Sequence, residues 1–174
     1  MKPIPYLGSS AFLAVFLLLC AHSLSAAPQP GMKGLFNQGK AAYQAGDYPE
    51  ALEKWEAALE KAEQVGDKRV ISIFASNLGL AYAKAGEAKK ALAFHQKAMD
   101  MNLEMGDRKN AAINLNNIGA MYNDLGRHEK AVEAYHRAAE IRHEAGDRSG
   151  EARVLSNLGV VYCDAGQYKD AFGI

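Results

Sequence analysis

The sequence predicts an all-α protein, a solenoid built from stacked antiparallel helix pairs. Two observations favour this fold class. A Gly-Asp dipeptide returns every 40 residues, at 66–67, 106–107 and 146–147. Between these dipeptides the apolar side chains lie three or four residues apart, which is the spacing of one face of a helix. A constant period of this length indicates units that bury their apolar faces by stacking on their neighbours.

Each unit is expected to hold two helices. In the second unit the first helix is marked by Ile71, Ala75, Leu78 and Tyr82. The second helix carries an equally regular stripe, formed by Ala88, Ala91, Leu92, His95, Ala98 and Met99. Gly86 and Gly106 are placed to end these helices, because glycine adopts a left-handed cap without a side-chain clash.

Two further residues of the repeat have a predicted local role. Asp107 follows the glycine at the junction and is expected to cap the next helix, because its carboxylate can accept a backbone N–H of the first turn. Gly79 lies inside a helix, where glycine costs roughly 1 kcal/mol relative to alanine. We expect it to allow a close approach to Ala91 and Ala98 of the partner helix.

The residues that return at this period form a recognisable pattern. They are Asn77, Asn117 and Asn157; Gly79, Gly119 and Gly159; Tyr82, Tyr122 and Tyr162; and Gly86, Gly126 and Gly166. An earlier unit aligns less fully through Gly39, Gly46, Ala51 and Ala58. The pattern Asn-Leu-Gly-x-x-Tyr, followed by one glycine and two alanines, resembles the tetratricopeptide repeat over about residues 33–174.

The resemblance implies a right-handed superhelix and divides the chain into units. These are residues 33–66, 67–106, 107–146 and an incomplete 147–174. The usual repeat of the family has about 34 residues, so this chain resembles its longer-helix variety of 40 residues. The tryptophan slot of the family holds Ala75, Leu115 and Leu155 here, and its aromatic slot holds Trp55, His95 and Tyr135. These departures suit longer helices.

The resemblance also implies a ligand site on the concave face, which the first helix of each unit would line. Asn77, Asn117 and Asn157 occupy the slot that projects into the groove of similar repeats and bonds the main chain of a bound peptide. An amide suits that task because it offers both a donor and an acceptor. The alternative is that each amide satisfies backbone groups of the adjacent repeat.

Other polar residues extend the predicted groove. Arg153 lies four residues before Asn157, one turn along the same helix face, so the two side chains could hold a carboxylate and a main chain together. Ile73 and Ile113 fill the slot of Arg153 in the other units, so such a clamp would be local to one end. The same side of the helices is predicted to include Asn116, Asn123 and Lys84.

Several function classes are disfavoured by the sequence. The 20 Lys and Arg residues balance the 20 Asp and Glu residues, so no net field attracts nucleic acid. No nucleophile elbow, phosphate loop or cysteine pair occurs. The histidines His95, His128, His136 and His143 lack the short paired spacing of a zinc site and are predicted to be packed or solvated. We therefore expect no catalytic residue, no cofactor, no metal and a protein or peptide as the partner.

Residues 1–27 are predicted to be a signal peptide, and 28–32 a linker. Lys2 gives a positive start, and residues 11–19 form an apolar run that is shorter than the roughly 20 residues of a spanning helix. Small residues then precede an expected cleavage near Ala26 or Ala27, which predicts a periplasmic or secreted protein. The alternatives are an uncleaved membrane anchor and a lipoprotein modified at Cys20. Cleavage would leave Cys163 as the single cysteine, predicted to be a small inert filler.

The last unit reaches Ile174 after one turn of its second helix. We expect this to expose Leu155, Leu158 and Tyr162, because solenoids generally need polar terminal caps. This unfinished unit favours a truncated product, a fragment of a longer protein, or an end that a partner covers. The function predicted from these features is an exported, non-catalytic scaffold that binds a peptide or protein segment in the concave groove. The alternatives are a docking region of a longer enzyme or signalling protein, and a structural array that self-associates through its uncapped C-terminal end.

Overall fold

The computed structural model describes residues 31–166, which contain seven helices and no strand. The helices are α2 (Met32–Ala45), α3 (Tyr48–Val65), α4 (Lys68–Lys84), α5 (Ala88–Glu104), α6 (Arg108–Asp124), α7 (His128–Glu144) and α8 (Arg148–Asp164). The predicted signal peptide lies outside the described residues. None of the helices in the described part combines the length and the hydropathy needed to cross a membrane.

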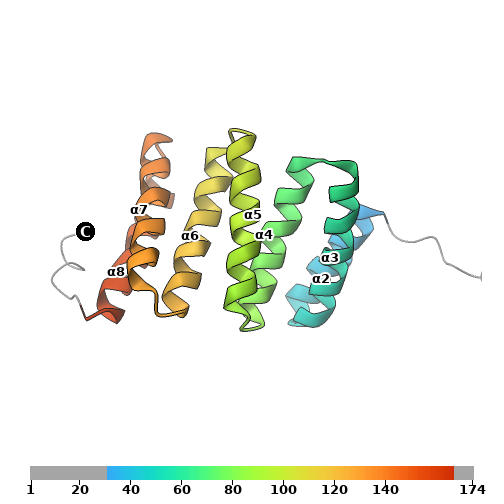
Figure 1. Ribbon diagram of the computed structural model, residues 1–174, viewed down its shortest axis with the longest axis horizontal. Coiled ribbons are helices and arrows are strands. Elements are labelled where there is room, and N and C mark those ends of the chain that lie inside the picture. The colour runs from blue at the N-terminus through green and yellow to red at the C-terminus, as the bar shows by residue number, and fades with distance from the viewer. Residues whose placement is uncertain (1–30, 167–174) are drawn as a thin grey trace, which may run out of the picture. The chain divides into compact units, whose positions relative to one another are not determined.

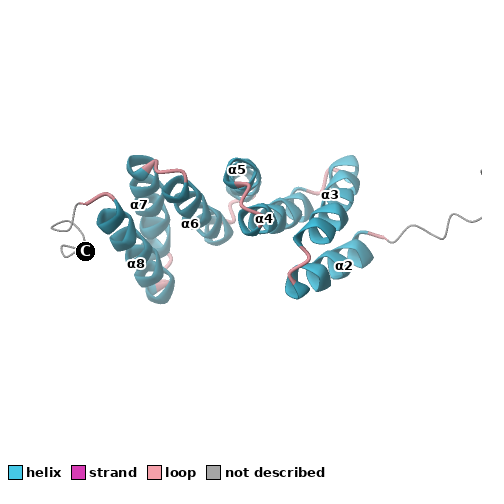
Figure 2. Ribbon diagram, turned by 90° about the horizontal axis from the view of Figure 1, so that it is seen from below, coloured by secondary structure: helices cyan, strands magenta, loops and turns pink. Residues whose placement is uncertain are grey.

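The helices pack in chain order as pairs (Figure 1). The pair α2 and α3 is followed by α4 and α5, by α6 and α7, and by α8, which is the first helix of the next unit. Each connection has only two or three residues, so successive helices run antiparallel. Figure 2 shows α3, α5 and α7 along one side of the array and α2, α4 and α8 along the other. The predicted all-α solenoid of helix pairs is confirmed.

Glycine ends each helix unit as the sequence predicts. Gly86 and Gly106 adopt a left-handed conformation with φ of 77° and 71°, and the N–H of Gly106 donates to the carbonyl of Leu103 in the last turn of α5. The aspartate that follows the glycine then caps the next helix. Asp107 accepts the backbone N–H of Asn110 at 3.1 Å, and Asp147 accepts that of Gly150 at 2.9 Å. Both capping predictions are therefore confirmed.

The core consists of small and aromatic side chains on the facing sides of the helices. The alanines at the two repeated positions of the second helices are fully buried; they are Ala51, Ala58, Ala91, Ala98, Ala131 and Ala138. One apolar cluster surrounds Trp55 and Leu78, and another surrounds Tyr135 and Leu158. Burial of this apolar surface stabilises the stack of repeats.

Two predictions about packing need correction. Leu158 is fully buried, because it packs into the cluster of Leu115 and Tyr135 in the preceding unit; only Leu155 and Tyr162 are partly exposed. Gly79 does allow a close approach, but the group that approaches it is the ring of His95 and not the small side chains of α5. The ring lies where a Cβ on this glycine would have to be.

Candidate peptide-binding groove

The three predicted groove asparagines lie at equivalent places on successive first helices. Asn77 is on α4, Asn117 on α6 and Asn157 on α8, and each is partly exposed. The structure extends the series by one residue, because Asn37 stands 40 residues before Asn77, on α2, and is exposed. The sequence contained this signal, since the earlier unit aligns through Gly39 at the same period. Four amides thus share one side of the array.

The hydrogen bonds of these amides connect the helices to themselves and to one another. Asn77 donates from Nδ2 to the Ile73 carbonyl of its own helix at 2.8 Å. Asn157 donates to Oδ1 of Asn116 in the preceding unit at 2.9 Å, and Asn116 donates to Oδ1 of Asn117 at 3.5 Å. Within residues 31–166, none of the three bonds the backbone of an adjacent repeat. Each amide keeps hydrogen-bonding capacity for a ligand.

The remaining predicted site residues differ in their surroundings. Arg153 is exposed on α8 and has no ion-pair partner in the part of the chain that the structure describes. Lys84 is exposed in the last turn of α4. Asn123 is already engaged, because it donates to Asp164 Oδ2 at 2.8 Å and contacts Nδ1 of His128 at 2.9 Å. Its position therefore links α6 to α7 and α8.

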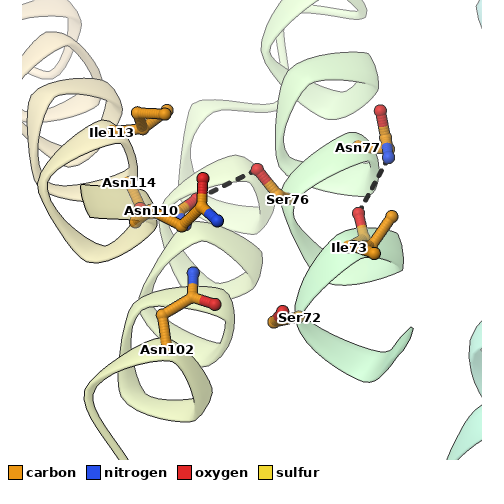
Figure 3. A pocket seen from close by; sticks show the side chains of 8 residues that line it. All are labelled: Ser72, Ile73, Ser76, Asn77, Asn102, Asn110, Ile113 and Asn114. Carbon is orange, nitrogen blue, oxygen red and sulfur yellow. Dashed lines mark hydrogen bonds between the residues drawn. The ribbon is translucent and has the colours of Figure 1, made fainter. Parts of the chain in front are cut away.

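A polar hollow of about 180 Å³ opens beside Asn77 (Figure 3). It lies where α4, the C-terminal part of α5 and the N-terminal part of α6 meet. The lining residues are Ser72, Ile73, Ser76, Asn77, Asn102, Asn110, Ile113 and Asn114. The hollow is therefore lined by hydroxyl, amide and aliphatic groups and by no charged side chain.

A hydrogen-bond network centred on Asn114 forms one wall of the hollow. Asn114 donates from Nδ2 to the Asn110 carbonyl at 3.1 Å, so its Oδ1 is the acceptor for Ser76 Oγ at 3.1 Å and for the His95 ring at 3.2 Å. This assignment places the proton of His95 on Nδ1. Burial lowers the pKa of His95 from its ordinary 6.5 to about 4, against the opposing effect of the Asn114 hydrogen bond. The imidazole is therefore neutral at pH 7.

A comparison with protein families decides the identity of the fold. Residues 33–104 and 110–173 match the tetratricopeptide repeat family. The chain belongs to the tetratricopeptide repeat family. No curated protein matches it in sequence.

Solved structures with tetratricopeptide-like repeats superpose well at low sequence identity. A putative kinesin light chain from Podosopora anserina with nearly identical TPR-like repeats has a TM-score of 0.70 at 15% identity, over 80% of this chain and 69% of that one. The apo form of RapI has a TM-score of 0.75 at 18% identity, over 93% of this chain and 59% of that one. At this level of identity the likeness establishes the fold alone.

A Rap protein crystallised with competence and sporulation factor is also similar. Its TM-score is 0.70 at 18% identity, over 82% of this chain and 40% of that chain. This chain therefore spans less than half of that Rap protein.

Asn102 and Asn114 were not among the predicted site residues, although the tetratricopeptide period contains a signal for both. Asn114 stands where the neighbouring units have Phe74 and Val154, and Asn102 stands where the first unit has Ala62. An amide in a repeat slot that is otherwise apolar marks a local polar feature in the core. The third residue at the Asn102 slot is Arg142, which is also polar and buried.

Arg142 forms a second buried polar site at the junction of α7 and α8. It is 4% exposed and pairs through Nη1 with Asp147. Its Nε and Nη2 are enclosed and have no hydrogen-bond partner among the described residues. Gly150 makes room for it, because a Cβ there would collide with the guanidinium.

The other candidates for chemistry are less organised. No group of three His, Cys, Asp or Glu side chains within residues 31–166 could hold a metal ion. His95 is buried in the slot of Trp55 and Tyr135, as predicted, and His136 is exposed. The thiol of Cys163 is free and exposed on α8, so this residue does not fill a core position.

Proposed function

We propose that this chain is an exported, non-catalytic scaffold that binds an extended peptide or protein segment along its first helices. The observation that carries this proposal is the row of amides at equivalent positions, formed by Asn37, Asn77, Asn117 and Asn157. A row of this kind offers one donor and one acceptor per repeat. Main-chain N–H and C=O groups of an extended segment require that combination.

The surroundings of the row support a polypeptide ligand. Ile73, Leu80 and Val160 are exposed on the first helices α4 and α8, so apolar contacts are available beside the amides. Arg153 adds one positive charge near Asn157, which suits a carboxylate at that end of the ligand. Interfaces that combine polar and apolar groups in this way are typical of protein–protein recognition.

The fold also favours binding over catalysis. Tetratricopeptide repeats present an extended surface, and the similar Rap protein was crystallised in a complex with competence and sporulation factor. We place the binding partner of this chain outside the cytoplasm, because residues 11–19 and the small residues before Ala27 have the pattern of a cleaved signal. Sequencing the N-terminus of the protein recovered from the cell envelope tests the cleavage: a chain that retains Met1 would contradict a cleaved signal and favour the uncleaved anchor, and a chain that is absent from the envelope and the medium would contradict export.

Selection from a random peptide library displayed on phage, with the full chain immobilised, tests the binding function. We expect the combined Asn117→Ala and Asn157→Ala variant to bind the selected peptides about ten-fold more weakly or worse. Each substitution removes the hydrogen bonds of one amide to the peptide main chain, and the loss of two amides corresponds to that change in affinity. Gln96→Ala is the matched control, because Gln96 is an exposed amide on the second helix α5. Helicity should be unchanged in all three proteins.

Two outcomes would contradict the proposal. A library that yields no peptide above background would argue against a polypeptide ligand. Peptides that bind the double variant as tightly as the original chain would show that the asparagine row is not the contact surface.

A further inference from the structure

We propose that the polar hollow between α4, α5 and α6 is a selective pocket for a carboxamide, the side-chain group of glutamine or asparagine. This inference rests on the proposed function in one respect, because the carboxamide would belong to the segment bound along the first helices. Asn77 connects the two sites, since it is both a member of the asparagine row and part of the rim of the hollow (Figure 3).

The strongest indication is the unsatisfied amide of Asn102. This residue is 3% exposed, and its side chain points into the space between Ser72 and Asn110 (Figure 3). Its amide has no hydrogen bond to any of the described residues. Among residues 31–166, the side-chain nitrogen and oxygen atoms that are both fully enclosed and without a hydrogen-bond partner belong to Arg142 alone. The Asn102 amide also has no partner but is not fully enclosed, so it reaches the open space of the hollow. No side chain or backbone group of the described residues occupies the donors and the acceptor of this amide, so a ligand that supplies both an acceptor and a donor could bind to it.

The charge of the lining restricts the ligand to neutral groups. No Lys, Arg, Asp or Glu side chain lines the hollow. His95, behind Asn114, is neutral and uses its Nδ1 proton within the network. A carboxylate or an ammonium group in this position would lose its hydration without gaining a counter-charge, which is strongly unfavourable.

The size and the rim of the hollow fit a side chain that ends in an amide. About 180 Å³ is well above the roughly 10–15 Å³ that a single water needs. Ile73 and Ile113 lie on opposite sides of the opening, where they can contact the aliphatic part of a glutamine side chain (Figure 3). The amide at its end would then reach Asn102.

The pair of amides is specific to this junction and is held in place. The slots of Asn102 and Asn114 hold Ala62 and Phe74 at the preceding junction, and Arg142 and Val154 at the following one. Asn114 is fixed by three hydrogen bonds, to Asn110, Ser76 and His95. A wall that is already oriented requires little rearrangement when a ligand binds.

Nuclear magnetic resonance with a capped amino acid tests this pocket. The full chain, labelled with ¹⁵N, is titrated with N-acetyl-glutamine N-methylamide, and the side-chain amide signals of Asn102 and Asn114 are followed. We expect saturable shifts of both signals at millimolar ligand, because so small a ligand has few contacts. The capped glutamate and capped leucine analogues should bind at least about ten-fold more weakly.

Variants separate the pocket from the asparagine row. Asn102→Ala should abolish the shift of the Asn114 signal, and Asn102→Ser provides a second variant that keeps a polar group if the first is poorly folded. The combined Asn117→Ala and Asn157→Ala variant should keep full binding of the capped glutamine, because neither residue lines the hollow.

The outcomes are distinct from those of the peptide selection. No shift of the Asn102 signal, or equal shifts with capped leucine, would overturn the carboxamide pocket and leave the groove function standing. A capped glutamine that binds while no library peptide is recovered would support the pocket and contradict the groove.

Discussion

The imidazole of His95 lies directly against Gly79, on the facing helix of the same repeat. A Cβ on Gly79 would fall 2.6 Å from both Nδ1 and Cε1 of the ring. The same relationship joins Gly39 to Trp55 and Gly119 to Tyr135. The glycine of the first helix and the ring of the second are therefore one packing unit, repeated in each complete helix pair.

Gly79→Ala is predicted to destabilise the protein. The added methyl group would force the His95 ring out of a site that is 1% exposed and would break its hydrogen bond to Asn114. Overpacking of a buried site costs about 1–3 kcal/mol and the lost hydrogen bond about 1 kcal/mol more, against a gain of roughly 1 kcal/mol from replacing a mid-helix glycine by alanine. We expect a net loss of about 1–3 kcal/mol in the free energy of unfolding, measured by urea denaturation.

Gly159→Ala is the matched control, since a Cβ there meets no atom of the described structure within 4 Å. This variant should gain up to about 1 kcal/mol from helix propensity alone. Equal effects at Gly79 and Gly159 would show that the ring does not determine the need for glycine.

Local signals in the sequence were sufficient for the fold. The period, the glycines at the turns and the aspartate caps each follow from one residue and its neighbours in the chain, so Gly106 and Asp107 could be assigned before the structure was known. The partner of Gly79 was predicted incorrectly, because the rotation of one helix against another decides whether a glycine faces an alanine or a ring. That rotation depends on all the contacts between the helices.

The candidate site was predicted less completely. The asparagine row was predicted because its members return at the repeat period, but the bonds they form depend on the spacing between units, as in Asn157 and Asn116. Asn102 and Asn114 break the period and were overlooked for that reason. A break in a repeat is informative only when the neighbours of the changed residue are known, and those neighbours come from three different helices.

Acidification is predicted to destabilise the protein through His95. The pKa of this residue is lowered to about 4 in the folded chain and is near 6.5 in an unfolded one. Because the unfolded state binds the proton more readily, the stability from the neutral ring is complete above pH 6.5 and is lost as the pH falls towards 4. The difference in pKa corresponds to roughly 3 kcal/mol at most. Urea denaturation between pH 7.5 and 4 measures the loss.

His95→Gln provides the control for this pH dependence. The glutamine amide can donate to Asn114 but does not titrate, so this variant should show a much smaller loss of stability between pH 6.5 and 4. Asn114→Asp should act in the opposite direction to burial, because a carboxylate 3.2 Å from Nδ1 would raise the pKa of His95. An unchanged acid profile in both variants would assign the titration to another group.

Asp147 and Asp107 cap equivalent helices but are predicted to differ in importance. Both accept a backbone N–H of the next helix, whereas only Asp147 also pairs with a buried guanidinium, that of Arg142. The hydrogen bond from the Gly150 N–H and the one from Arg142 lower the pKa of Asp147 below its ordinary value. The stability that they contribute is therefore lost as the pH falls through that lowered pKa, which lies below the pH range in which His95 acts. Asp107→Ala should cost about 1 kcal/mol, the usual value of a helix cap.

Asp147→Ala should cost roughly twice as much as Asp107→Ala or more, because it removes the same kind of cap and also leaves Arg142 buried without a counter-charge. The excess should disappear when Arg142 is absent. In an Arg142→Ala background, Asp147→Ala should therefore destabilise the protein no more than Asp107→Ala does. The urea midpoints of the original chain, the Asp147→Ala and Arg142→Ala variants and the double variant form the double-mutant cycle that measures this. The first unit indicates that this background will fold, since it has Ala62 in the slot of Arg142. Equal losses of stability for Asp147→Ala and Asp107→Ala in the unmodified chain would contradict this prediction. They would mean that the Arg142 guanidinium does not depend on Asp147 for its counter-charge, and that other groups bind its Nε and Nη2.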